Sequence, residues 1–189
     1  MRITRLAAVA VVAVLSAAPA TATESLNIYG DAEHSSCLIS DVAPGPITLY
    51  IFHENTPEAF WSMFRVAADG GFTGLLVSHS VPPGFFYLGD PMVDYSISYG
   101  GCRLGTFLIA TLVFDGFGTS ETCAHIWLDD APSSYLPGEL LTSGCSEELK
   151  IPATNGPAVV NYDDCPAWCI TATEESSWGR IKALYRDYR

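Results

Sequence analysis

The sequence predicts an all-β protein, built as a single antiparallel β-sandwich. Short runs of β-branched and aromatic residues recur along the chain, and clusters of Gly, Pro and Asp separate them at the spacing of sandwich strands. Between Glu24 and Cys169 no stretch shows a convincing 3.6-residue apolar period, which argues against helices. The chain has 189 residues and is 49% hydrophobic and 16% charged, so it can bury a core and is neither a disordered tail nor a fibre.

Alternation of apolar and polar residues places the strands in order. Residues 107–115 are apolar on both faces, as expected of a central strand, while the other runs alternate. Asp115-Gly116-Phe117-Gly118 is typical of a hairpin turn. The predicted strands cover residues 26–29, 47–53, 59–66, 75–81, 94–99, 107–115 and 122–128, with weaker ones at 148–151 and 158–161.

Residues 1–22 have the layout of a secretory signal peptide. A basic start precedes an apolar core from Leu6 to Leu15, and small residues lead to a predicted cleavage site at Ala20-Thr21-Ala22. This core is about half of the ~20 residues that cross a bilayer, which argues against an uncleaved transmembrane helix. We therefore expect an exported protein, in the periplasm, the cell envelope or outside the cell, with no stable membrane insertion after cleavage.

The remaining chain is strongly acidic. It holds seven basic and twenty-one acidic residues, a net charge of −14. Such a surface repels phosphate backbones, so we expect no nucleic-acid partner.

Six cysteines follow the signal peptide, and an even number in an exported chain indicates disulfides. Three bridges are expected, although the sequence does not choose among the fifteen possible pairings. The alternative is a zinc site, but only Cys165 and Cys169 are close in sequence and no His stands at ligand spacing from them. The disulfide candidates are Cys37, Cys102, Cys123, Cys145, Cys165 and Cys169.

The last residues, 171–189, are predicted to form a C-terminal amphipathic helix. Apolar residues recur there at helical intervals, with acidic residues at its start and basic residues at its end. Residues 180–189 carry four basic residues and one acidic residue, a net charge of +3, whereas residues 23–179 carry −17. The tail can dock on its own domain or bind an acidic partner. The tail residues proposed to interact are Trp178, Ile181, Lys182, Leu184, Tyr185 and Arg186.

The run Trp178-Gly-Arg-Ile-Lys-Ala-Leu-Tyr-Arg186, together with the strand layout before it, resembles a group of small exported bacterial proteins of uncharacterised function. These proteins end in a W-G-x-[IV]-K-x-L-Y-R tail, and their bodies look like cohesin or immunoglobulin-type sandwiches. The resemblance implies a β-sandwich placed outside the cytoplasm. It implies no activity and no catalytic residues.

Enzymatic motifs are missing from the sequence. It has no G-x-S-x-G elbow and no H-E-x-x-H, because Asn55-Thr56-Pro57 follows His53-Glu54. His79 and His125 lie in predicted strands, where a hydrogen-bonded structural role is expected. A secreted hydrolase acting on polysaccharide or peptide is kept as the alternative, because triads are recognised by geometry rather than by sequence order.

Pairs of acidic residues can bind calcium when several of their oxygens gather on loops. Asp129-Asp130, Asp163-Asp164 and the Asp90/Asp94 pair match no calcium-loop spacing, so we expect no cofactor and keep calcium as the lesser alternative.

Three consecutive aromatics stand between turn residues in the segment 82–91, which we interpret as a loop. Flat rings at a sandwich rim can stack on a sugar or on another protein, although alternation would instead bury at least one of Phe85 and Tyr87. Trp61 and Trp168 are open to the same two interpretations. The ligand-binding candidates are Phe85, Phe86, Tyr87 and Trp168.

We therefore predict a signal peptide at 1–22, a β-sandwich at 25–170 and a helical tail at 171–189. The expected role is non-catalytic binding or assembly outside the cytoplasm, with another envelope or extracellular protein, or a glycan, as the partner.

Overall fold

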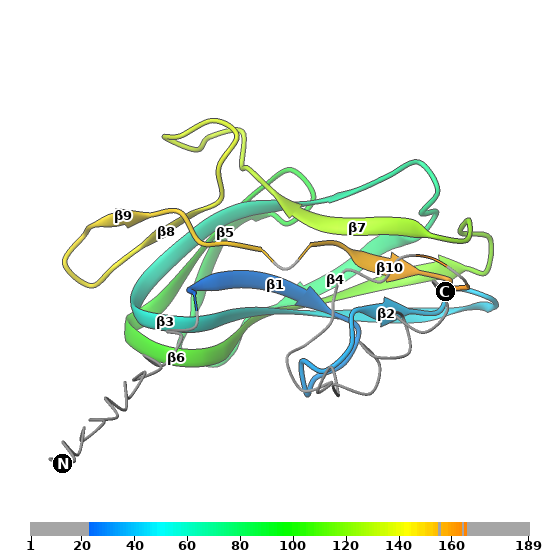
Figure 1. The fold of residues 1–189 in the computed structure, drawn as a ribbon, viewed down its shortest axis with the longest axis horizontal. Coiled ribbons are helices and arrows are strands. Elements are labelled where there is room, and N and C mark those ends of the chain that lie inside the picture. The colour runs from blue at the N-terminus through cyan, green and yellow to red at the C-terminus, as the bar shows by residue number, and fades with distance from the viewer. Residues whose placement is uncertain (1–22, 155, 164, 166–189) are drawn as a thin grey trace, which may run out of the picture.

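The computed structural model describes residues 23–154, 156–163 and 165, and within them the chain is built from ten strands (Figure 1). The predicted signal peptide, the C-terminal helix, Asp164 and Trp168 lie outside the described residues. No helix among the described residues has the length and apolarity to span a membrane. The strands are β1 (Ser25–Tyr29), β2 (Leu38–Ile39), β3 (Pro44–Ala68), β4 (Leu75–Ser80), β5 (Phe86–Asp90), β6 (Asp94–Phe117), β7 (Ala124–Asp129), β8 (Leu141–Ser143), β9 (Leu149–Lys150) and β10 (Ala158–Val160).

The antiparallel pair β3–β6 is the central pair of strands in the fold, and both strands bend in the middle. Register shifts interrupt the pairing between Ile51 and Trp61, where Asn55 and Gly105 adopt positive φ. Before the bend the odd-numbered residues of β3, such as Ile51, are buried. After it the even-numbered residues, such as Phe64, are buried. As a result the two halves of each strand lie in two layers, and the strands curve round one end of the molecule (Figure 1).

Pairing with the two halves assigns the other strands to layers. β1 pairs with the first half of β3, and β4 pairs with the second half of β6, so these strands form one layer. β7 and β8 pair with the second half of β3, and β5 pairs with the first half of β6, so these strands form the other layer. Strand β10 pairs with β7 and runs parallel to β2, and β9 pairs with β8. This is a sandwich with mostly antiparallel strands, as the sequence predicted.

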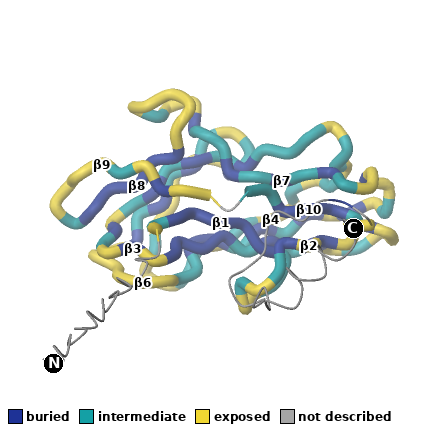
Figure 2. Tube along the Cα trace, in the orientation of Figure 1, coloured by how far each residue is buried: buried dark blue, intermediate teal, exposed yellow. Residues whose placement is uncertain are grey.

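The core lies between the two layers and consists of the inward side chains of both. Figure 2 marks the buried residues along the strands. Phe64 and Tyr95 come from one layer, Leu49 and Phe114 from the other, and all four are fully buried or nearly so. Strands β6, β3 and β7 place alternate residues inward there, so the opposite set of their side chains lies on the surface, and β5 is exposed along its whole length.

The strands differ from the predicted ones in several places, since residues 94–99 and 107–115 are one strand, β6, and β2 and β8 were not predicted. Residues 47–53 and 59–66 belong to one continuous strand, β3, because the bulges bend the strand without ending it. Residues 115–117 continue β6 and pair with residues 44–46, so the predicted hairpin turn at 115–118 is wrong. Much of the predicted loop 82–91 is strand β5, paired to β6.

Candidate functional site

The candidate site is the surface of the layer formed by β5, the first half of β6, the second half of β3, and β7. On β3 the buried Ser62, Phe64 and Val66 alternate with residues that remain partly exposed, and β6 and β7 alternate in the same way. The register aligns these exposed residues across the strands. We call this surface the outer face; its residues are Phe86, Leu88, Asp90, Asp94, Ser96, Ser98, Trp61, Met63, Arg65, Ala67, Trp127 and Asp129.

Six of the twelve outer-face residues are apolar or aromatic. Phe86 is 69% exposed and Leu88 is 78% exposed, both on the edge strand β5. Trp61, Met63 and Trp127 are half-buried on the neighbouring strands. Large apolar side chains gathered on one face, with a charged margin, are typical of protein-binding surfaces.

The outer face carries one ion pair and two further carboxylates. Arg65 donates to Asp129 with an Nη2–Oδ2 distance of 2.6 Å. The Nε of Arg65 is buried and has no hydrogen-bond partner. Asp94 accepts from the backbone N–H of Ser133, and Asp90 accepts from that of Met92. The outer face is therefore net negative.

The three predicted aromatics of segment 82–91 do not form one rim. Phe85 turns toward the core, 5.2 Å from the Tyr99 ring and beneath the guanidinium of Arg103. Tyr87 lies on the inner side of β5, with its ring 4.7 Å from that of His79. Only Phe86 belongs to the outer face, because successive residues of a strand point to opposite sides.

Among the described residues, a buried chain of hydrogen-bonded polar groups is the arrangement most similar to a catalytic site. The His53 Nδ1 lies 3.0 Å from the Tyr99 hydroxyl, which hydrogen-bonds Ser62, and the His53 Nε2 lies 2.8 Å from Glu24. Ser62 donates to Thr142 over 3.1 Å. Burial lowers the pKa of His53 against the opposing pull of Glu24, and burial raises the pKa of Tyr99.

This buried chain has no access to a substrate. His53, Ser62 and Tyr99 are 0% exposed. A cavity of about 420 Å³ lies elsewhere, between the 138–140 loop and the 151–154 segment, and Thr23, Asp130 and Glu139 are among its lining residues. The chain of hydrogen bonds therefore satisfies buried polar groups in the core.

The other predicted histidines also have structural partners. His79 Nδ1 lies 3.0 Å from the Tyr95 hydroxyl, and His125 Nδ1 lies 3.0 Å from Asp69. Both contacts fit the hydrogen-bonded role expected from their strands.

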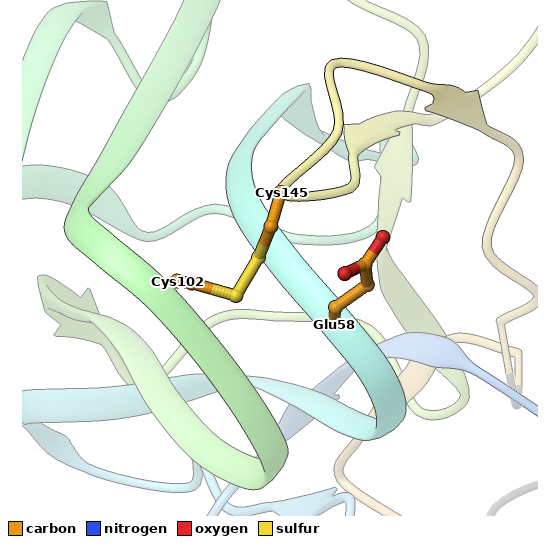
Figure 3. Close-up of side chains that lie close together, drawn as sticks. All are labelled: Glu58, Cys102 and Cys145. Atoms are coloured by element: carbon orange, nitrogen blue, oxygen red, sulfur yellow. A yellow bond between two sulfur atoms is a disulfide. The ribbon is translucent and has the colours of Figure 1, made fainter.

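Among the described residues, one group has ligand atoms close enough together for a metal: Glu58, Cys102 and Cys145, within 4.8 Å of one another. Cys102 and Cys145 are joined in a disulfide, so neither offers a thiolate, and Glu58 lies beside the bridge (Figure 3). The group is a disulfide with a neighbouring carboxylate, not a metal site.

Two of the predicted disulfides are defined. Cys102 pairs with Cys145, and Cys123 pairs with Cys165, with Cα–Cα distances of 5.5 and 5.8 Å. Cys37 is disulfide-bonded as well, and none of the described cysteines is free. Of the acids considered for calcium, Asp130 accepts from the backbone N–H of Gly138 over 2.8 Å and Asp129 pairs with Arg65.

Sequence reasoning missed most of the outer face. It singled out Trp61 and Phe86 but not Met63, Leu88 or Trp127. The signal was present, because the buried alternation of 62–66 and 124–128 places residues 61, 63 and 127 on the opposite side. The tail residues from Trp178 to Arg186 lie outside the described residues, so the structure does not address their role.

Comparisons with known proteins define the class of fold. No protein-family model matches the sequence, and no curated protein matches it either. Solved structures do match: a type II cohesin domain from the cellulosome of Acetivibrio cellulolyticus has a TM-score of 0.55 at 14% identity, covering 74% of this chain and 96% of that one. A cohesin module from a Clostridium perfringens family 33 glycoside hydrolase has a TM-score of 0.53 at 8% identity, covering 75% and 98%.

A third similar structure is the sixth cohesin of scaffoldin B from Acetivibrio cellulolyticus, in complex with the Cel5 dockerin. Its TM-score is 0.50 at 9% identity, and the match covers 75% of this chain and all of that one. The body of the protein is therefore a cohesin-like β-sandwich, as the resemblance implied.

Proposed function

We propose that this protein is a non-catalytic binding module that acts outside the cytoplasm and takes up a protein partner on its outer face. The observation that carries the proposal is the composition of that face: Phe86 and Leu88 are exposed on β5, and Trp61, Met63 and Trp127 are half-buried on β3 and β7, beyond Ser96 and Ser98 of β6. Phe86 and Leu88, which are 69% and 78% exposed, contribute little to the core and can bury against a partner.

The kind of partner follows from the chemistry of the face. An apolar edge on a face with net negative charge fits a protein surface that presents apolar residues flanked by Lys or Arg. The structural neighbours give the proposal a direction, since one of them is a cohesin bound to a dockerin. A dockerin-like helical module with a basic margin is the partner class that we propose.

The hydrolase alternative receives no support from the described residues. The one His–Tyr–Ser arrangement with a carboxylate is sealed in the core. A general base needs to reach its substrate, and His53 is 0% exposed.

Substitution on two edge strands tests the proposed face. F86S/L88S removes apolar surface from β5, and L75S/V77S on β4 is the matched control, since Leu75 and Val77 are 62% and 57% exposed on the other layer. Binding is measured by calorimetry against dockerin modules purified from exported proteins of the source organism. We expect F86S/L88S to abolish binding and L75S/V77S to retain it. Equal binding by both variants would exclude the outer face.

A further inference from the structure

Strand β5 has one edge that no other described strand pairs with. Its partner is β6, to which it is joined in an unbroken antiparallel register. In the turn between the two strands the backbone oxygen of Asp90 accepts from the N–H of Val93, so the backbone groups of Asp90 point toward β6. In an antiparallel pair alternate residues point these groups the same way. The N–H and C=O groups of Tyr87 and Gly89 therefore point away from β6, along the unpaired edge.

The unpaired edge of β5 lacks the features that normally prevent two strands from joining. Exposed edges are usually protected by charged side chains, by Pro or by a bulge. β5 contains no Pro and no register shift, and its one charged residue, Asp90, stands at its end. Before it Phe86, Tyr87 and Leu88 are 69%, 49% and 78% exposed. By contrast β4, which pairs with the other half of β6, is interrupted by a register shift. The edge of β5 is thus the better template for a further strand.

The side chains along this edge are complementary to those of a second copy. Two β5 strands can pair antiparallel about a two-fold axis at Tyr87, the middle of the apolar run. Phe86 of one copy then lies opposite Leu88 of the other on the outer face, twice in the dimer, and the two Tyr87 side chains lie opposite each other on the inner side. Asp90 lies opposite Gly84, so no carboxylate of β5 faces another across the new pair.

The backbone groups match in the same register. The two Tyr87 residues exchange two N–H···O bonds, and the N–H of each Gly89 reaches the backbone oxygen of Phe85 in the other copy. The N–H of Phe85 is already bonded to the oxygen of Pro82 over 3.0 Å, so it needs no further partner. The pairing therefore satisfies the outward N–H groups of β5 in both copies.

We propose that two copies of this chain associate through the free edge of β5, so that one outer face continues into the other. The association itself does not depend on the proposed function, because Tyr87 lies on the inner side of β5. Its consequence does: a dimer with two joined outer faces holds two dockerin-like modules side by side.

Charge and size set the strength of this association. Residues 75–89 contain no Asp, Glu, Lys or Arg, yet each copy carries −14 after signal removal. Salt screens the repulsion between two such copies, so the dimer should strengthen as salt rises. Three exposed side chains per copy bury less than the ~1,200 Å² typical of stable complexes, so the dimer should dissociate on dilution.

Analytical ultracentrifugation of the full chain after signal removal tests the association. We expect a dimer whose fraction rises with protein concentration and with sodium chloride. Y87K places two Lys side chains opposite each other at the two-fold axis and should weaken the dimer at least about tenfold. V77K adds the same charge to the other edge strand, β4, where Val77 is 57% exposed, and is the matched control. Both V77K and Y87F, which keeps the ring, should dimerise as the parent does.

Amide hydrogen exchange in the parent protein tests the register without any substitution. The N–H groups of Tyr87 and Gly89 are free in the monomer and bonded in the dimer. Their exchange should therefore slow about tenfold when about nine-tenths of the chains are dimeric. The N–H groups of Phe86 and Leu88 point toward β6 in both states and should change little.

Two outcomes overturn the inference. A monomer at every protein and salt concentration shows that the edge of β5 takes no second copy. A dimer that V77K abolishes and Y87K retains shows that another edge joins the copies. Y87K changes no residue of the outer face, so its monomer should still bind dockerin modules. Failure of those modules to bind a parent protein that dimerises would reject the proposed function and leave the association intact, so the two results are distinguishable.

Discussion

One oxygen of the Glu24 carboxylate lies 2.8 Å from the Nε2 of His53, which is completely buried. The same oxygen accepts a hydrogen bond from the Thr56 hydroxyl at 2.8 Å, and Lys150 lies 3.8 Å from the other oxygen. Glu24 directly precedes β1, so this carboxylate ties the start of the sandwich to the bend of β3. The predicted cleavage after Ala22 would leave Glu24 in the exported protein.

Removal of this carboxylate should destabilise the fold. In E24A the ring of His53 and the hydroxyl of Thr56 both lose a partner, and an unsatisfied buried group costs about 1–3 kcal/mol. Urea unfolding should therefore show a free energy of unfolding lower by about 2 kcal/mol than that of the parent. E33A, which removes an exposed carboxylate, is the control and should match the parent. Equal stability of E24A and E33A would contradict a structural role for the network.

Stability should fall on mild acidification because of His53. Burial lowers the pKa of His53 below its ordinary value of 6.5, so the unfolded chain binds a proton more readily than the folded protein does. Its contribution is fully present above pH 6.5 and is lost as the pH falls below 6.5 toward the lowered pKa. We expect the free energy of unfolding to decrease by up to about 1.4 kcal/mol per pH unit there. In H53Q that decrease should be smaller; an unchanged slope would show that other groups cause it.

The two defined disulfides should each contribute strongly to stability. They join residues 43 and 42 apart in sequence, and bridges of that span stabilise by about 4 kcal/mol in the chain-entropy account. C102S/C145S and C123S/C165S should each lower the melting temperature markedly. Non-reducing peptide mapping should show these two pairs, and the three-bridge prediction leaves Cys37 with Cys169. Any other pairing, or free thiols, would contradict that prediction.

Asp41 should act as a buried anchor between the loop from β2 to β3 and the loop from β6 to β7. Its carboxylate is 1% exposed and accepts from the backbone N–H of Gly118 at 2.8 Å and from Ser120. Burial alone would raise its pKa, but these hydrogen bonds outweigh burial and lower the pKa below 3.8. Its contribution is thus present above pH 3.8 and is lost as the pH falls through the lowered pKa.

The variant D41N tests this anchor, because an amide presents a nitrogen where the carboxylate accepts. We expect a loss of about 1.5–3 kcal/mol at pH 7, the range for hydrogen bonds to charged groups. D115N, on the exposed surface of β6, should change the stability little. A D41N loss no larger than that of D115N would show that the carboxylate is not needed.

The sequence predicted the layered architecture because inward residues alternate strictly wherever one side of a strand is buried. Ile47, Leu49 and Ile51 are an example, and all three are core residues. It did not predict that β3 passes through its bulges without ending, since Asn55 and Pro57 are typical of a loop and only long-range pairing with β6 maintains the strand. Strand β5 was missed for a related reason. Phe86, Tyr87 and Leu88 follow one another without an intervening polar residue, and all three are exposed, so no alternation of apolar and polar residues marks the strand.

Gly89 holds the strand that carries Phe86 and Leu88, which makes it a sensitive position for the proposed site. Its φ of +91° favours glycine, and a Cβ there would lie 1.9 Å from the backbone oxygen of Asp94, its neighbour across the turn. Two controls separate these effects: Gly138 has a φ of +86° with open space around it, and Gly101 has open space and no positive φ.

We expect G101A to be neutral and G138A to lose about 1–2 kcal/mol from backbone strain alone. G89A should lose more than G138A, because β5 must also move away from β6 to relieve the clash. Since β5 forms the edge of the outer face, G89A should weaken dockerin binding as well, whereas G138A should bind as the parent does. Urea midpoints and calorimetry measure the two effects separately. Normal binding by a destabilised G89A would contradict a binding site that depends on the geometry of β5.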